Sequence, residues 1–224
     1  MKRSALKKFA WAGVLLAAFV LFTIAVAAVD VQPIGPAGSA VGFATVNGFM
    51  FDRIGVHLVW HQITNWLGVT ALCPVFVFAM MGLYQLIRRN DIRKVDRRLI
   101  ALGAFYALLT VCYLLFEVIE INCRPIILNK ELEASYPSSH VMLVICVVVT
   151  AAMQLRSLLP GRKQLRRAVG MIAWVISAVT VVGRMLSGVH WFTDIVGGVL
   201  ASTAMIALYC GAVDLLDPAL HPGE

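Results

Sequence analysis

Two histidines and an aspartate in the second half of the chain have the types and spacing that phosphoryl transfer requires. His190 and Asp194 are four residues apart, so on a helix they share a face and their side chains can meet. A carboxylate beside one imidazole nitrogen fixes the tautomer and leaves the other nitrogen basic. We therefore expect His190 to be a nucleophile that forms a phosphohistidine, Asp194 to be its partner, and His140 to protonate the leaving oxygen.

Four further residues are suited to hold the phosphate group. They are Arg124, Arg184, Ser138 and Ser139. Guanidinium groups match phosphate oxygens in pairs. Pro137 suits the first position of a helix because it lacks an N–H group, and the serine N–H groups and hydroxyls after it would then face an anion at the helix N-terminus. A second helix that begins near His190 would add another positive dipole end.

Membrane-spanning helices are the elements expected to position these residues. Of the 224 residues, 60% are hydrophobic and only 14% are charged, which excludes an ordinary soluble globule and a disordered chain. About 20 mostly apolar residues cross a bilayer as a helix. Six stretches qualify: 9–29, 66–87, 99–121, 137–155, 168–187 and 192–213. Alternation with period two is weak, which argues against a transmembrane barrel. We expect an all-α, six-helix membrane bundle formed by a single domain over residues 1–224.

The basic residues lie almost entirely in connections on one side of these spans. Fifteen of the 19 Lys and Arg residues fall in the N-terminal segment, the second connection and the fourth connection. They are Lys2, Arg3, Lys7 and Lys8; Arg88, Arg89, Arg93, Lys94, Arg97 and Arg98; and Arg156, Arg162, Lys163, Arg166 and Arg167. Short basic connections stay in the cytoplasm. We therefore expect a multi-pass cell-membrane protein whose site faces the non-cytoplasmic side, and no nucleic-acid partner.

The first span and the outer loop after it, residues 30–65, have less distinctive patterns. The basic start of the span and the small residues 25–27 resemble a cleaved signal peptide, but an apolar run of about 20 residues favours a retained anchor. In the loop, residues 41–60 are mostly apolar, and Trp60 and Trp66 suit the headgroup level of a bilayer. This pattern predicts an interfacial helix.

Other candidate metal and redox residues have simpler interpretations. His57 and His61 are four residues apart, but no third ligand is nearby, and we interpret them as polar residues on a wet helix face. A cation between the two site histidines and Asp194 is disfavoured, because the neighbouring arginines would repel it. The cysteines have no CxxC spacing and are interpreted as small hydrophobic residues. They are Cys73, Cys112, Cys123, Cys146 and Cys210. No metal or cofactor is expected.

Three segments between residues 117 and 194 resemble the motifs of the type-2 phosphatidic acid phosphatases, the PAP2 superfamily of membrane-embedded lipid phosphatases. The third segment reads Gly183-Arg184, five residues, His190, three residues and Asp194; the second reads Pro137-Ser138-Ser139-His140; the first is reduced to Arg124-Pro125. The resemblance implies a six-span fold, the roles given above for the histidines, the aspartate, the arginines and the serines, and catalysis without a metal ion.

The chain departs from the family motifs at three positions. Glu117 stands where the family has Lys, Ser139 where it has Gly, and Gly183 where it has Ser. A carboxylate near a phosphate dianion is repulsive, so Glu117 is a candidate for pairing with an arginine, for reading a substrate amine or hydroxyl, or for facing the watery mouth of the site. Lys130 is a candidate for restoring the lost positive charge.

The leading hypothesis is hydrolysis of a lipid phosphate or diphosphate at the outer face, with an isoprenoid diphosphate, phosphatidate or phosphatidylglycerophosphate as the substrate. Two alternatives belong to other classes. One is a phosphotransferase that passes phosphate to a lipid or sugar acceptor. The other is a non-catalytic binder or transporter of lipid phosphates.

Overall fold

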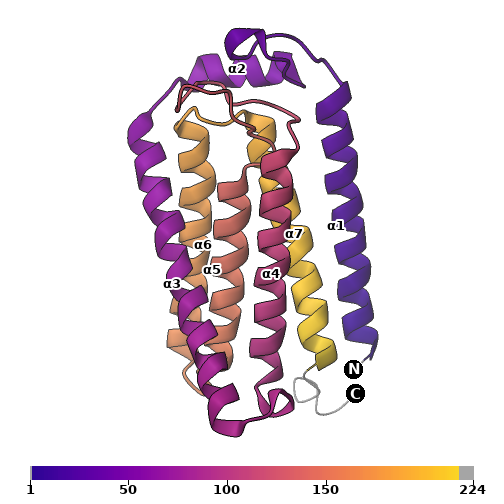
Figure 1. Cartoon of the computed structure of the whole chain (residues 1–224), viewed down its shortest axis with the longest axis vertical. Coiled ribbons are helices and arrows are strands. Elements are labelled where there is room, and N and C mark those ends of the chain that lie inside the picture. The colour runs from indigo at the N-terminus through magenta and orange to yellow at the C-terminus, as the bar shows by residue number, and fades with distance from the viewer. Residues whose placement is uncertain (1, 217–224) are drawn as a thin grey trace.

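Six long helices run side by side along the longest axis of the molecule (Figure 1). The computed structural model describes residues 2–216. Each of the six helices is long and apolar enough to cross a membrane. They are α1 (Lys2–Ala28), α3 (Leu58–Arg89), α4 (Arg97–Val118), α5 (Ser139–Ser157), α6 (Lys163–Leu186) and α7 (Phe192–Leu216). The expected all-α bundle with six spans is therefore confirmed.

Several helices begin earlier than their apolar stretches. α1 begins at Lys2 rather than at residue 9, α3 at Leu58 rather than at 66, and α6 at Lys163 rather than at 168. Hydropathy marks the part of a helix that crosses hydrocarbon, whereas the helical backbone continues into polar surroundings. The added turns of α1 and α6 contain Lys and Arg, which are good helix formers. The connection between α3 and α4 contains a short 3₁₀ helix, Ile92–Lys94. Asp96 then caps α4, its side chain accepting a hydrogen bond from the Arg98 N–H.

A short helix, α2 (Ala44–Ile54), lies across one end of the bundle (Figure 1). It corresponds to the interfacial helix predicted over 41–60 but is shorter at both ends. Gly55, at φ +72°, ends the helix, and the chain turns directly into α3. The loop before α2 contains the 3₁₀ helix Pro36–Gly38. The end of the bundle that carries α2 is called the site end below, and the opposite end is called the basic end.

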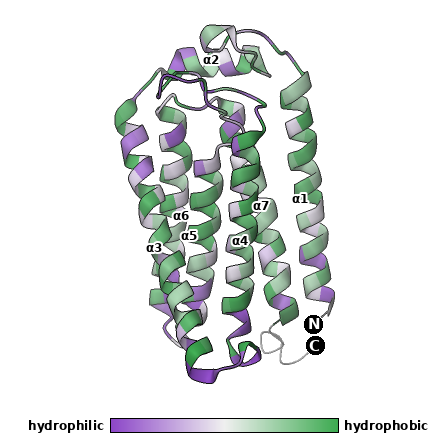
Figure 2. Cartoon of the chain, in the orientation of Figure 1, coloured by the Kyte–Doolittle hydropathy of each residue, from purple (hydrophilic) through white to green (hydrophobic). Residues whose placement is uncertain are grey.

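The helices are mostly hydrophobic along their middle, and hydrophilic residues concentrate toward the two ends of the bundle (Figure 2). α5 lies at the centre and packs against α3, α4, α6 and α7, while α1 packs chiefly on α7. Small residues allow this close approach: a Cβ on Gly211 of α7 would lie 3.0 Å from the ring of Phe9 on α1. Large apolar side chains also point outward, for example Trp174, which is 73% exposed. Such a surface suits lipid rather than water.

The segment before α5 closes tightly against α7. A Cβ on Gly197 would lie 2.6 Å from the Tyr136 ring, and a Cβ on Gly198 would lie 2.9 Å from the Ser138 carbonyl oxygen. The Tyr136 ring is buried against Phe19, and its hydroxyl lies 2.7 Å from Thr23 Oγ1 on α1. Burial raises the pKa of Tyr136 to about 12, so the phenol stays protonated. α1, α7 and the start of α5 are thereby held together at the site end.

This packing predicts that Gly197→Ala destabilises the protein. The added methyl group has no room beside the fixed Tyr136 ring, and overpacking of this kind costs about 1–3 kcal/mol. The thermal unfolding temperature in detergent should fall. Gly82→Ala is the matched control, because a Cβ on Gly82 of α3 meets no atom within 4 Å and alanine favours a helix by about 0.5–1 kcal/mol. Equal unfolding temperatures for the two variants would contradict the close contact.

Candidate active site

Three segments meet at the site end: the α4–α5 loop, the first turn of α5 and the turn between α6 and α7. The loop folds back on itself through an antiparallel bridge between Cys123 and Ala134. The Ser138 N–H then donates a 2.9 Å hydrogen bond to the Asp194 carbonyl oxygen. This bond joins the start of α5 to the start of α7, so residues more than 50 positions apart in sequence share one site.

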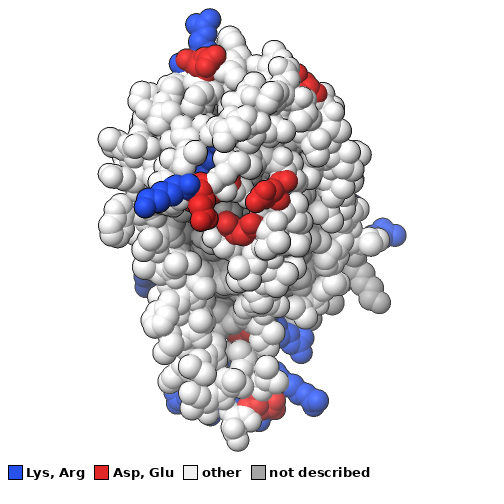
Figure 3. Space-filling model, turned by 45° about the horizontal axis from the view of Figure 1, so that its top comes forward, with Lys and Arg blue, Asp and Glu red and all other residues white. Residues whose placement is uncertain are grey.

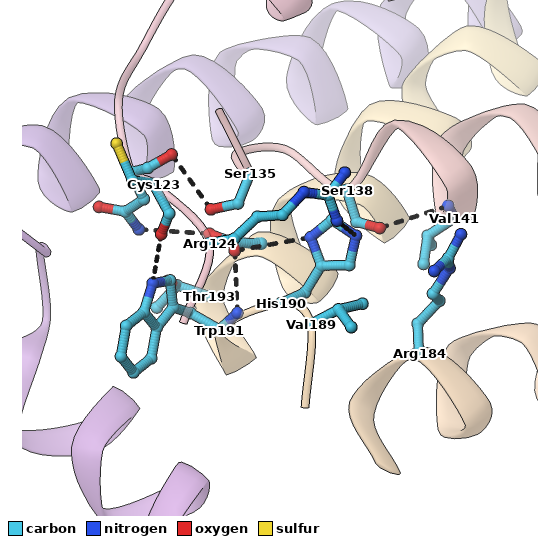
Figure 4. A network of polar contacts seen from close by, with 12 residues as sticks. Cys123, Arg124, Ser135, Ser138, Val141, Arg184, Val189, His190, Trp191 and Thr193 are labelled. Carbon is cyan, nitrogen blue, oxygen red and sulfur yellow. Dashed lines mark hydrogen bonds and ion pairs between the residues drawn. The ribbon is translucent and has the colours of Figure 1, made fainter. Parts of the chain in front are cut away.

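His190 lies at the centre of this region (Figure 4), and both His190 and Asp194 are buried. His190 Nδ1 is 3.7 Å from Asp194 Oδ2, longer than a hydrogen bond but close enough for electrostatic pairing. His190 lies in the turn before α7 and not within the helix, which begins at Phe192. The expected spacing of four residues therefore brings the two groups together without both being helical.

The Asp194 carboxylate is held by hydrogen-bond donors that include the Ser135 side chain, the Trp191 N–H and the Asn122 amide, and the histidine is not one of them. Its Oδ2 accepts a 2.9 Å hydrogen bond from the Trp191 N–H, and its Oδ1 accepts a 3.2 Å bond from Asn122 Nδ2. The Asn122 side chain also accepts from the Gly42 N–H at 3.0 Å, and its carbonyl oxygen accepts from the Ser135 N–H at 2.8 Å. Asn122 thus connects the carboxylate to the α4–α5 loop and to the segment before α2.

Arg124 lies directly beside His190 (Figure 4). Its Nη1 is 3.4 Å from His190 Nε2. Because an arginine only donates, Nε2 of the imidazole is the accepting, unprotonated nitrogen, and Nδ1, which lies 3.7 Å from Asp194 Oδ2, carries the proton. Burial, together with the positive charges of Arg124 and Arg184, holds the pKa of His190 well below its usual range. The imidazole is therefore neutral and presents a free electron pair at neutral pH.

A carboxylate from the α4–α5 loop pairs with this arginine. Glu133 Oε2 is 2.7 Å from Arg124 Nε, and its Oε1 accepts a 2.9 Å hydrogen bond from Asn129. The backbone of the loop supports the pair, because the Arg124 N–H donates to the Glu133 carbonyl oxygen at 3.0 Å. An acidic side chain thus pairs with the Nε group of the guanidinium that is expected to bind phosphate.

Arg184 is 3% exposed and is held by two residues of α3. Its Nη1 donates to His61 Nδ1 at 2.9 Å, and its Nη2 donates to Asn65 Oδ1 at 2.8 Å. Asn65 Nδ2 and His61 Nε2 also lie 3.1 Å apart. The fork of the guanidinium is therefore oriented by two neutral acceptors. His61, interpreted from the sequence as a polar residue on a wet face, contacts the site instead.

His140 is the second residue of α5, and its Nε2 lies 3.0 Å from the Thr64 carbonyl oxygen of α3. A carbonyl oxygen only accepts, so this nitrogen carries the proton. A Cβ on Gly68 would lie 2.4 Å from the same ring atom, which shows how closely α3 approaches the imidazole. Among residues 2–216 no group of three or more His, Cys, Asp or Glu side chains is arranged to hold a metal ion.

The start of α5 differs from the sequence expectation. The helix begins at Ser139 with Ser138 as its N-cap, so Pro137 precedes the cap and is not the first helical residue. The Ser138 hydroxyl accepts from the Val141 N–H at 3.5 Å, and its N–H is used by Asp194. The Ser138 N–H is therefore not free for an anion as expected, whereas the hydroxyl, which accepts at its oxygen, keeps a proton that it can donate to phosphate. The N–H groups of Ser139 and His140, in the first helical turn, have no acceptor within the helix.

The departure at position 183 has a steric reason. A Cβ on Gly183 would lie 2.7 Å from Thr64 Cγ2 and 3.1 Å from the Trp60 ring. The serine of the family motif has no room here, because α3 approaches α6 at this point. The same close approach brings His61 and Asn65 within reach of Arg184.

Acidic and basic side chains gather around a hollow at the site end (Figure 3). The α4–α5 loop contributes Glu120, Glu131 and Glu133, and Lys130 is exposed in the turn between residues 129 and 131. Glu117 is exposed in the last turn of α4. The carboxylate that pairs with Arg124 is that of Glu133, so Glu117 does not take this role.

α2 anchors the turn that carries His190. Asn47 is completely buried; its Nδ2 donates to Thr193 Oγ1 at 2.9 Å and its Oδ1 accepts from the Thr193 N–H at 3.1 Å. Trp191 packs against Phe51 of α2, and its Nε1 donates to the Cys123 carbonyl oxygen at 2.7 Å. Sequence reasoning missed these supporting residues, and only the lone asparagine within the apolar segment before α3 hinted at a buried polar contact.

Comparisons with known proteins agree with this arrangement. The family model described as "PAP2 superfamily" matches residues 101–215. Phosphatidylglycerophosphatase B of Bacillus subtilis (strain 168) is 29% identical over 182 residues, which cover 80% of this chain and 85% of the relative. The crystal structure described as the first transmembrane PAP2-type phosphatidylglycerolphosphate phosphatase, from Bacillus subtilis, superposes with a TM-score of 0.59 at 19% identity, covering 93% of this chain and 98% of that one. With six spanning helices around the matched motifs, the chain is a multi-pass membrane protein that belongs to the PAP2 superfamily.

Proposed function

We propose that this PAP2 protein hydrolyses a lipid phosphate through a phosphohistidine on His190. The observation that supports the proposal most strongly is the contact of 3.4 Å between Arg124 Nη1 and His190 Nε2. A guanidinium group that touches the nucleophilic nitrogen lies where it can bind the phosphoryl group under attack. The neutral, oriented imidazole and the adjacent cation together supply a nucleophile and charge stabilisation.

In the first step, the electron pair of His190 Nε2 attacks phosphorus and the bond to the ester oxygen breaks. The imidazole becomes cationic, and the Asp194 carboxylate at 3.7 Å stabilises that charge. Arg124 and Arg184 neutralise the phosphoryl oxygens, and the first-turn N–H groups at Ser139 add donors at a helix N-terminus. In the second step, water attacks phosphorus, the P–N bond breaks, and inorganic phosphate leaves.

His140 supplies the proton that the leaving oxygen takes up and later receives one from the attacking water. In this structure its Nε2 proton is directed at the Thr64 carbonyl oxygen. A neutral imidazole that gave up this proton would become an imidazolate, so the acid role requires His140 to take up a second proton as the phosphate binds and to return to the neutral form when the leaving oxygen is protonated. Arginines fill the positions at which a cation would otherwise neutralise phosphate, so we propose that the reaction proceeds without a metal ion.

Phosphatidylglycerophosphate is the proposed substrate, ahead of phosphatidate and isoprenoid diphosphates. The 29% identity to phosphatidylglycerophosphatase B over 80% of the chain supports this choice. Exposed Glu117 and Lys130 near the mouth remain candidates for reading the headgroup, the carboxylate through a glycerol hydroxyl and the lysine through phosphate.

We further propose that the site faces the non-cytoplasmic side of the cell membrane, because the basic connections lie at the opposite end.

Purified protein in detergent should release inorganic phosphate from phosphatidylglycerophosphate in the presence of a chelator. His190→Ala should lower turnover by at least about 10³-fold, and His140→Ala by about 10²–10⁴-fold. His57→Ala is the matched control and should leave turnover unchanged, because His57 is exposed in the turn before α3. Full activity of the His190 variant would refute the proposal, and transfer of labelled phosphate to a second lipid would favour a phosphotransferase.

On the acid side of the pH profile, kcat/KM should fall only at a pH below the ordinary pKa of histidine. Only neutral His190 attacks phosphorus, and its pKa is lowered by burial and by the two arginines, so activity is lost only as the pH falls through that depressed value. Arg124→Gln should move the limb upward by removing one positive charge, whereas Arg124→Lys should leave it in place. Measuring all three proteins on one substrate makes its own ionisation common to every profile. A limb that does not move in Arg124→Gln would contradict the assignment.

Glu133→Gln should strengthen product inhibition by inorganic phosphate by about two- to fivefold. The carboxylate competes with phosphate for Arg124, and a partly exposed ion pair contributes about 0.2–1 kcal/mol. The inhibition constant of phosphate measures this directly. Glu131→Gln, an exposed neighbour that changes the charge equally, is the control and should have a smaller effect. Equal effects of the two variants would show that general charge, and not the ion pair, controls phosphate binding.

A further inference from the structure

A second polar cavity, of about 520 Å³, lies at the basic end of the bundle. α5 and α7 form most of its wall, through Met153, Gln154, Arg156, Ser157, Tyr209, Cys210, Val213 and Asp214. α1, α4 and α6 each contribute one basic residue, namely Lys8, Arg98 and Arg166. Its volume is within the range of about 300–1,000 Å³ that small ligands occupy. None of these residues belongs to the proposed catalytic site.

The charges around this cavity favour an anion. Asp214 is 3% exposed but is compensated by Lys8, whose Nζ lies 2.7 Å from its Oδ2, and by the Ser4 hydroxyl at 2.8 Å. Arg156 and Arg166, from the two sides of the α5–α6 connection, then add positive charge. The Arg156 guanidinium lies beside Gly170 of α6, 3.5 Å from where a Cβ there would be, which keeps it at the cavity wall.

A buried amide provides an independent indication of a ligand. Gln154 is 2% exposed and lines the cavity, and its Nε2 has no hydrogen-bond partner among residues 2–216. An unsatisfied buried donor costs about 1–3 kcal/mol, and leucine at this position would avoid the cost. An unpartnered amide donor in a cavity that Arg156 and Arg166 also line is suited to an acceptor-rich phosphate group.

We propose that this cavity binds the phosphate group of an acidic phospholipid at the face opposite to the catalytic site. Met153 and Val213 extend the wall as apolar surface, which suits the glycerol and the first methylene groups of a lipid better than a free ion. Basic pockets between helices on the cytoplasmic side are known to hold anionic headgroups. The site is separate from the proposed hydrolysis, and only its cytoplasmic placement relies on the orientation proposed above.

Native mass spectrometry of the whole protein in detergent tests this site, with phosphatidylglycerol and phosphatidylcholine as the added lipids. The double variant Arg156→Gln/Arg166→Gln should bind phosphatidylglycerol about thirtyfold more weakly, at about 1 kcal/mol per charge and about 1.4 kcal/mol per tenfold. Gln154→Leu should weaken it severalfold. Phosphatidylcholine binding should change little, because its headgroup has no net charge.

Arg162→Gln/Arg167→Gln is the matched control. It removes the same charge from the same connection, and its two exposed arginines do not line the cavity. Because phosphatidylglycerol also reaches the catalytic site, each variant is compared with the unmodified protein. Equal weakening in both double variants, or no effect of Gln154→Leu, would overturn the proposal. In a further experiment, inorganic phosphate is added to compete with the bound lipid. Displacement of the lipid adduct would assign the site to soluble phosphate anions, and persistence of the adduct would assign it to lipid.

Discussion

The burial of the Asp194 carboxylate is the constraint around which the site end is built. A charge with no exposed surface is tolerated only when donors surround it, and here these include the Trp191 N–H and the Asn122 amide. Both donors come from irregular backbone, which must therefore be fixed by other contacts. Asn122 is held by Gly42 and Ser135, and Trp191 by Phe51 and the Cys123 carbonyl. The loop before α2, the α4–α5 loop and the α6–α7 turn thus share one hydrogen-bonded centre.

The two arginines that we propose to bind phosphate have different environments. Arg184 is buried and faces neutral acceptors on α3, so its charge remains uncompensated and its geometry is fixed before substrate arrives. Arg124 is paired with Glu133 on a loop, and a phosphate group must compete with that carboxylate. One arginine supplies a preorganised positive field, while the other exchanges one anionic partner for another. The exchange also explains why a loop rich in acidic residues is compatible with binding a dianion.

The six spans and the meeting of the three motifs were predictable from the sequence, because length, hydropathy and the one-sided basic residues determine them. The interfacial helix was predicted too long, since apolar composition continues past Gly55, where the backbone turns. The Ser138 N–H was expected to face an anion, but it donates to the Asp194 carbonyl oxygen, so only the Ser138 hydroxyl proton stays available to phosphate. His61, Asn65 and Asn122 were missed, because their partners lie more than 70 residues away in sequence. Such contacts depend on helix packing that no local pattern encodes.

The departures from the family motifs make sense together rather than one at a time. Glycine at position 183 lets α3 approach α6, and that approach gives Arg184 its two acceptors, His61 and Asn65. A serine there would move the helices apart and loosen the guanidinium. Glu117 stands where the family motif has lysine, so the proposed site has one cation fewer. Arg184 is the most buried cation that remains, and the orientation of its guanidinium is therefore more important than in a site with a third cation. In the reaction that we propose, close helix packing offsets the charge lost at position 117 by fixing the Arg184 guanidinium.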